Sequence, residues 1–383
     1  MGLALGRHID GLVDAYYGPP ELARRAAEEP IRSPTELEAR ARHLLAALEA
    51  DGELDATRRH FLAAQVRGLR TTAARLAGQA IGYVDEVATC YGVRPEMAPE
   101  DTFMAAHRRL DEALPGSGPL AERYVTWREA QAVPADKLRP AIDSIAEDLR
   151  ARTDTLWGLP EGERVDFELV TNQPWAGFNY YLGDLHSRVA INVDLPVLST
   201  SLGHLVAHEA YPGHHTEHCR KEVGLVRRRR HLEETIFLVG TPQCLLAEGL
   251  ADLGLEVVAG RRPEPVVAAH LRPLGIAYDA DLVGELAEAG EALGKVRGNA
   301  ALLLHDRRAG VDTVVDYLVR WSLLSKRRAE KQVQFLTDPT WRAYTFCYAE
   351  GMALCRRFVA GDPARFARLI SEQLTPSDLG AAA

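Results

Sequence analysis

Long apolar runs are missing from this sequence of 383 residues. No stretch reaches the roughly 18–20 consecutive apolar residues that a helix needs to cross a bilayer. At the N-terminus, Arg7, His8 and Asp10 come too early to leave room for the apolar stretch of a signal peptide. We therefore expect a cytoplasmic protein with no membrane partner.

Paired cysteines are missing as well. The chain has five cysteines, and no two of them form a CxxC pair: Cys90, Cys219, Cys244, Cys347 and Cys355. An odd number at scattered positions indicates neither a disulfide framework nor a thiolate zinc site. We expect all five to be reduced thiols.

Positive charge is in deficit: the chain has 45 Lys and Arg residues and 54 Asp and Glu residues, which gives a net charge of −9. Nucleic acids and anionic membranes select clustered positive charge, so neither is expected as a partner. The run Arg227–Arg230 suggests a nucleic-acid patch at first sight. In a chain of this charge we interpret it as a solvent-exposed helix face.

Aromatic residues make up only 7% of the chain, whereas Ala, Leu, Arg and Glu are abundant and favour helix. Apolar residues at helical spacing predict helices in several stretches: two within 35–79, interrupted at 51–52, and others at 100–114, 118–131 and 136–153. Between 158 and 200 the pattern changes, and Val165–Val170 and Arg188–Asp194 are typical of strands. Helix resumes near Ser199. We predict a mainly α single domain over 1–383, with a helical part at about 1–155 and a part at about 156–383 that carries a small β-sheet and the site.

Histidine is the informative residue. Five of the 13 histidines lie within fifteen positions: His204, His208, His214, His215 and His218. A His-Glu pair followed by a second His is the zincin arrangement, in which two imidazoles hold Zn²⁺ and the Glu activates water. The usual second His comes four residues after the first, but Pro212 occupies that place here. His204 is expected as a neighbour on the same helix face, and His218 as a surface residue.

Pro212 and Gly213 predict how the spacing is repaired. In an unbroken helix, six residues turn by ~600°, which would put His214 on the wrong face. Pro212 clashes with the carbonyl of His208, and Gly213 allows backbone angles closed to other residues. We expect a kink here that folds His214 back toward His208.

A third ligand is predicted on a later helix, in the apolar run that contains Glu248. A carboxylate in such a run is costly to bury unless it is paired or bound to metal. Asp252 lies one turn further on the same face, where it could accept a hydrogen bond from a ligand histidine. The order His, Glu, His and then ExxxD is that of gluzincins.

These motifs resemble the bacterial domain-of-unknown-function 885 family, whose signature is HExxPGHH with a later EGWA. The resemblance extends over nearly the whole chain and includes 13–20, 191–194 and 348–351. It implies a zincin-like helical metallopeptidase architecture, similar to the thimet-oligopeptidase and carboxypeptidase Taq families, and it favours His214 over His215 as ligand. The chain departs from the family at Leu250, where a Trp is usual and pocket packing is affected. It also departs at 341–343, where the sequence Pro-Gly-Gln-Ala is common in the family. This difference places any inference about substrate recognition at that segment in doubt.

We therefore expect one Zn²⁺ bound by His208, His214 and Glu248, with water in the fourth position. Glu209 is expected to take a proton from that water and deliver it to the leaving amine of a short peptide. Non-peptide amide hydrolysis at the same zinc site, or a catalytically silent metal-stabilised scaffold that binds a peptide, are the alternatives. The intact Glu209 favours an enzyme, because a scaffold needs no general base.

Three further expectations concern the substrate. The late-helix tyrosine of the similar peptidases suggests Tyr348 as the donor to the oxyanion, with Tyr344 one turn earlier as its competitor. Gly351 would allow another backbone or a substrate to approach closely, and Arg356 could hold a substrate carboxylate. The strand Arg188–Asp194 is predicted to be an edge strand that pairs with an extended peptide.

Overall fold

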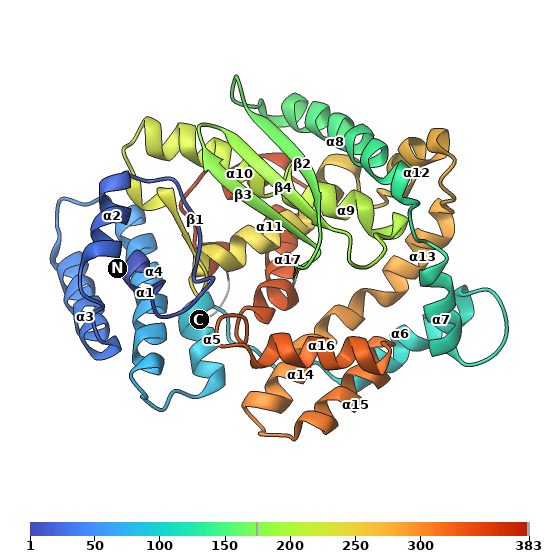
Figure 1. Cartoon of the computed structure of the whole chain (residues 1–383), viewed down its shortest axis with the longest axis horizontal. Coiled ribbons are helices and arrows are strands. Elements are labelled where there is room, and N and C mark those ends of the chain that lie inside the picture. The colour runs from blue at the N-terminus through green and yellow to red at the C-terminus, as the bar shows by residue number, and fades with distance from the viewer. Residues whose placement is uncertain (174, 381–383) are drawn as a thin grey trace.

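The computed structural model describes residues 1–173 and 175–380, which are mainly helical (Figure 1). The α-helices of the first half are α1 (Gly2–Leu5), α2 (Pro20–Glu28), α3 (Pro34–Ala50), α4 (Ala56–Leu76), α5 (Tyr83–Tyr91), α6 (Glu100–Ala113), α7 (Leu120–Glu129) and α8 (Ala135–Trp157). Those of the second half are α9 (Ser199–Glu209), α10 (His214–Lys221), α11 (Pro242–Ala259), α12 (Glu264–Leu271), α13 (Ala280–Gly290), α14 (Val296–His305), α15 (Val311–Ser322), α16 (Lys326–Thr337), α17 (Thr345–Val359) and α18 (Pro363–Leu369). The strands are β1 (Val13–Tyr16), β2 (Arg164–Val170), β3 (Gly177–Gly183), β4 (His186–Asn192) and β5 (Ile236–Leu238).

The helices predicted from periodicity are present. The two expected within 35–79 are α3 and α4, and those expected at 100–114, 118–131 and 136–153 are α6, α7 and α8. Local chemistry fixes where they begin. The Ser33 hydroxyl accepts a hydrogen bond from the Glu36 amide, and the Glu36 carboxylate accepts one from the Ser33 amide, which is a capping box at the start of α3.

A three-stranded sheet with the order β2-β4-β3 lies against α9 and α10 (Figure 1). β4 runs parallel to β2 and antiparallel to β3, so both of its edges are covered. The prediction that Arg188–Asp194 is an edge strand able to pair with a peptide is therefore wrong. The strand runs from His186 to Asn192, and its middle residues are buried in succession, as expected of a strand inside a sheet.

The edge strand beside the α9 helix is β3, which the sequence did not reveal. Its aromatic residues are not arranged in a clear alternation and glycines bound it at both ends. A second, two-stranded sheet joins β1 to β5 in antiparallel pairing, with an irregular register between Val13 and Ala15. This irregularity re-aims the intervening residue, Asp14.

Helix α11 forms the centre of the molecule, and it packs against α9 on one side and α17 on another (Figure 1). It is buried nearly all round. α11 and α17 cross where each has a glycine: a Cβ on Gly249 would lie 2.4 Å from the Gly351 carbonyl oxygen, and one on Gly351 would lie 2.8 Å from the Leu245 oxygen. The close backbone approach predicted at Gly351 is thus present, and its partner is a helix.

Two further sequence expectations can be compared with the fold. All five cysteines are buried free thiols, and Arg227–Arg230 is exposed to solvent. Within residues 1–173 and 175–380, no helix combines the length and the apolar character that crossing a bilayer requires.

Candidate metal centre

The break between α9 and α10 brings two histidines together. α9 ends with His208 and Glu209, and α10 begins at His214 after the predicted interruption at Pro212-Gly213. The His208 and His214 Nε2 atoms lie 3.1 Å apart. A Cβ on Gly213 would lie 1.9 Å from the His208 carbonyl oxygen, so the chain can turn back here only with glycine.

Glu248 of α11 is the third residue of the group. One of its carboxylate oxygens lies 3.4 Å from His208 Nε2, and the other lies 3.4 Å from His214 Nε2. Its side chain is buried, and Oε2 has no hydrogen-bond partner among the described residues. These three residues form a group that could hold a metal ion.

The spacing of these atoms fits zinc. A tetrahedral zinc ion with nitrogen ligands at ~2.0–2.1 Å and a carboxylate oxygen at ~2.0–2.2 Å places its ligand atoms about 3.3–3.5 Å from one another. The two histidine Nε2 atoms lie 3.1 Å apart, and each lies 3.4 Å from a different oxygen of Glu248, so the carboxylate spans the two imidazoles. The donor set of two imidazoles and one carboxylate is also that of catalytic zinc sites, which leave a fourth position open.

Electrostatics at this cluster favours positive charge. Burial alone would raise the pKa of Glu248, but His214 and His208 outweigh it and lower the pKa to about 2. Burial likewise works against a charged His208, yet Asp252 and Glu248 raise its pKa well above the usual value. The carboxylates therefore hold a cation between them, either a proton on imidazole or a metal ion.

Asp252 orients His208. Its Oδ1 lies 2.9 Å from His208 Nδ1, which leaves Nε2 directed at His214 and Glu248. This is the carboxylate–histidine arrangement that fixes metal-binding imidazoles. His204 Nε2 lies 3.3 Å from the same oxygen, and its side chain is 49% exposed. His204, His208 and Asp252 form a second possible metal group, but it would use the His208 nitrogen that Asp252 already engages.

Glu209 lies between the metal group and the edge strand β3. Its main-chain oxygen accepts a hydrogen bond of 2.6 Å from the Asn179 side chain, and a Cβ on Gly177 would lie 3.0 Å from its Oε1. The carboxylate itself has no hydrogen-bond partner among the described residues. Burial raises the pKa of Glu209, as does Glu248, while the neighbouring histidines lower it.

The two candidate tyrosines have different surroundings. The Tyr344 hydroxyl donates a hydrogen bond of 2.8 Å to Glu248 Oε1, and the residue is buried. Tyr348 packs edge-on against Tyr344 with ring centroids 5.3 Å apart, and it is 37% exposed. Burial and the Glu248 carboxylate raise the pKa of Tyr348 well above its usual value, so it keeps its proton. Tyr344 thus supports the ligand Glu248, whereas Tyr348 is accessible to solvent.

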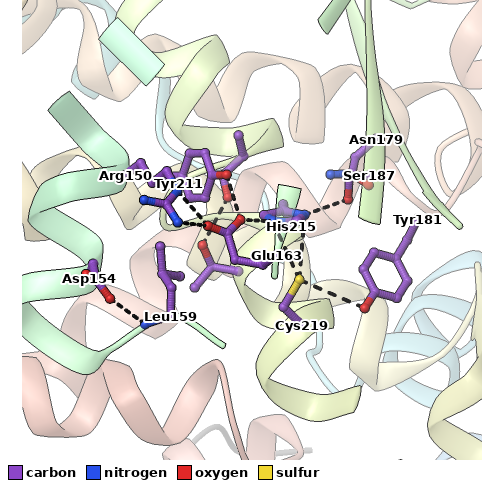
Figure 2. Close-up of polar contacts among 12 residues, drawn as sticks. Arg150, Asp154, Leu159, Glu163, Asn179, Tyr181, Ser187, Tyr211, His215 and Cys219 are labelled. Atoms are coloured by element: carbon purple, nitrogen blue, oxygen red, sulfur yellow. Dashed lines mark hydrogen bonds and ion pairs between the residues drawn. The ribbon is translucent and has the colours of Figure 1, made fainter. Parts of the chain in front are cut away.

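A second polar cluster, which we call the sealed cluster, surrounds His215 of α10 (Figure 2). It consists of Arg150, Glu163, Ser187, Tyr211 and His215. His215 Nε2 lies 2.7 Å from Glu163 Oε2, and Nδ1 lies 2.8 Å from the Ser187 hydroxyl. Tyr211 and Arg150 donate to the two oxygens of Glu163, at 2.7 and 2.6 Å. Because both ring nitrogens of His215 are engaged, the structure does not bring His215 to the metal group.

Two other expectations about histidine and arginine fail. His218 is buried rather than on the surface: its ring stacks on Tyr181 with centroids 4.6 Å apart, so the aromatic face of imidazole is used in the core. Arg356 is not free to hold a substrate carboxylate, because its guanidinium pairs with Glu256 at 2.9 Å and also with Glu291.

Asp14 belongs to this site, although no motif argument assigned it a role. Burial raises its pKa to about 7; Glu248 and Glu209 raise it too, and His214 lowers it, which places Asp14 within the field of all three. The only signal in the sequence was its position within the 13–20 segment that carries the family resemblance.

The comparisons with known proteins identify a fold but no family. No family model matches the chain, and no curated protein matches it. Its fold is similar to that of a "putative lipoprotein" from Colwellia psychrerythraea, with a TM-score of 0.53 and 16% identity over 93% of this chain and 70% of that one. A "putative lipoprotein of unknown function" from Shewanella oneidensis gives a TM-score of 0.47 and 11% identity over 93% and 74%. Because the first is described as a lipoprotein, a cytoplasmic location for this chain stays a prediction.

Proposed function

We propose that this protein is a zinc-dependent hydrolase of peptide bonds, with the zincin-like architecture that the sequence resemblance implies. The observation that carries the proposal is the group formed by His208, His214 and Glu248, in which two imidazole nitrogens and a buried carboxylate converge as the ligands of catalytic zinc sites do. The site also has a buried carboxylate, Glu209, next to the first ligand and not committed to any other group.

Zinc bound there would supply a Lewis acid that polarises a carbonyl and lowers the pKa of water. The chain's own residues supply the proton transfers. Glu209 accepts a proton from the attacking water and passes it to the leaving amine. Asn179 holds the main chain of Glu209 in place through its carbonyl. Tyr348 donates a hydrogen bond to the carbonyl oxygen as negative charge develops there.

A silent scaffold would leave these features without a purpose. Among the described residues no group donates a hydrogen bond to the Glu209 carboxylate, and its oxygens are not among the atoms sealed from solvent without a partner, so the carboxylate is free to bind water. The neighbouring sealed cluster shows how this chain satisfies carboxylates that serve structure alone. An uncommitted carboxylate beside a metal group is the arrangement that general-base catalysis needs.

The test combines metal analysis with turnover. Protein purified with zinc should contain one ion per chain and should hydrolyse short peptides in a screen with free and blocked termini. Glu209→Gln should keep the zinc and lose roughly 10²–10⁴ in kcat. Glu285→Gln, at an exposed position on α13, is the matched control and should be unaffected. Full activity in Glu209→Gln would contradict the proposal.

A further inference from the structure

Arg297 on α14 is a half-buried arginine without an anionic partner. Among the described residues, no carboxylate lies within ion-pair distance of its guanidinium, and no group accepts a hydrogen bond from it. Arg58 and Arg356, which are also half-buried, both pair with glutamates. A half-buried guanidinium with no anion beside it is free to receive one from outside the protein.

Arg297 lies beside the metal centre. Its guanidinium is 5.9 Å from the centroid of the Tyr348 ring, and α14 packs against α17. Burial lowers the pKa of Arg297, while Tyr348 and Asp252 raise it, so Asp252 is the carboxylate whose charge it feels. Its nitrogens are not sealed from water, because none is among the buried polar atoms that lack a partner. The guanidinium is therefore in contact with solvent, next to the Tyr348 ring.

The carboxylates of this region that stay ionised are Glu248 and Asp252, because the neighbouring histidines lower the pKa of both. A substrate carboxylate would be repelled here unless a cation received it. Arg297 is the side chain that can do so, because its planar fork matches a carboxylate with two parallel hydrogen bonds.

We propose that Arg297 binds a substrate carboxylate, and that this carboxylate is the free C-terminus of a peptide cleaved close to its end. Tyr348 connects the two ends of such a substrate, with its hydroxyl at the reacting carbonyl and its ring beneath the guanidinium. One residue spans at most ~3.3–3.6 Å, so a C-terminal carboxylate one or two residues beyond the scissile bond falls near Arg297. The substrate class rests on the proposed function; the carboxylate site itself is testable without turnover.

The experiment compares alanyl-alanine with its C-terminal amide, using the zinc-loaded protein. The wild type should favour the free acid by about 10–100-fold in kcat/KM, the range for a hydrogen bond to a charged group. Arg297→Gln should lower the value for the acid by the same factor, mainly through KM, and leave the amide unchanged. Arg297→Lys should restore part of the loss, and Arg357→Gln, at an exposed position on α17, should change nothing.

A binding measurement separates this inference from the proposed function. Calorimetric titration of zinc-loaded Glu209→Gln protein should show tighter binding of alanyl-alanine than of its amide, and the added substitution Arg297→Gln should abolish the difference. If no peptide is hydrolysed but this difference is seen, the proposed function fails and the carboxylate site stands. Equal binding of acid and amide would overturn the site. A control peptide, alanyl-aspartic acid with an amidated C-terminus, carries its one carboxylate on the aspartic side chain. If this peptide alone bound more tightly than alanyl-alanine amide, the C-terminal assignment would be overturned.

Discussion

Two adjacent histidines, His214 and His215, serve two clusters of opposite character. In the sealed cluster, both nitrogens of His215 and both oxygens of Glu163 have partners. In the metal centre, the Nε2 atoms of two histidines face each other at 3.1 Å, and one Glu248 oxygen has no partner among the described residues. Both clusters contain histidine, glutamate and tyrosine. What separates them is whether every polar atom is satisfied by the protein alone.

Access separates them too. Ser187, His215 and Glu163 have the composition of a hydrolytic triad, yet the serine and the histidine are completely buried, so no substrate can reach them (Figure 2). At the metal centre, Tyr348 is 37% exposed. A cluster of reactive residue types therefore indicates chemistry only where something is left unsatisfied and within reach of solvent.

Replacing each of the two histidines in turn should give the largest effects. His214→Ala should weaken zinc binding by more than the ~10–100-fold typical of losing an outer partner of a ligand. His215→Ala should largely keep zinc but lower the free energy of unfolding by roughly 3–5 kcal/mol, because Glu163 loses a buried partner. Competition with a chelator and urea unfolding of metal-free protein measure the two effects. Zinc retained in His214→Ala and lost in His215→Ala would reverse the ligand assignment.

The two tyrosines sharpen the same comparison within the metal centre. Tyr348→Phe should lower kcat by ~10²–10³ with little change in zinc affinity, because its hydroxyl is not committed to a ligand. Tyr344→Phe should instead weaken zinc binding, since Glu248 loses the hydrogen bond that holds it. Steady-state kinetics at saturating zinc, together with a zinc titration, distinguish them. A larger fall of kcat in Tyr344→Phe would move the oxyanion role to Tyr344.

Asp14 near the metal centre and Glu163 in the sealed cluster also differ in how their ionisation affects stability at different pH. This is the smallest of the expected effects. Burial opposes ionisation of both, but His215 and Tyr211 lower the pKa of Glu163, whereas the pKa of Asp14 rises to about 7. An unfolded Asp ionises near its ordinary pKa of ~3.9, while the folded protein keeps the proton up to about pH 7. The metal-free protein should therefore lose stability from about pH 4 to about pH 7, and level off above that.

Because Asp14 keeps some contact with solvent, we expect its share of that loss to be on the order of 1–2 kcal/mol. Asp14→Asn should flatten the profile, and Asp10→Asn, at an exposed position, should not. Urea unfolding between pH 5 and pH 8 with chelator present measures the difference. Identical slopes in wild type and Asp14→Asn would show that Asp14 is already ionised across this range.

Several helices and the turn at the site could be predicted from sequence, because each depends on local chemistry. Helical periodicity fixed α3, α4, α6, α7 and α8, and the Pro212-Gly213 pair indicated the break that brings His214 back to His208. Glu248 was found because a carboxylate in an apolar run demands an explanation. These signals all lie within a few residues of the feature they predict.

Features that depend on distant pairing could not be predicted in this way. The order of strands placed β4 in the middle of the sheet, and nothing local to Arg188–Asp194 encodes its two neighbours. His215 and His218 are buried because partners such as Glu163 and Tyr181 come from other elements. Asp14 and Arg297 come from segments far from the histidine motif in sequence, and no spacing connects them to it.

The crossing of α11 and α17 sets the width of the site. Gly249 follows the ligand Glu248 directly, and Gly351 lies one turn after Tyr348, so the two helices touch beside the reacting groups. Neither glycine could take part in catalysis, yet a single methyl group at either one would force the helices apart. The distance between the metal and the oxyanion donor can thus change during evolution without any substitution of a reactive residue. Substitution of either glycine, which carries no reactive group, would be enough.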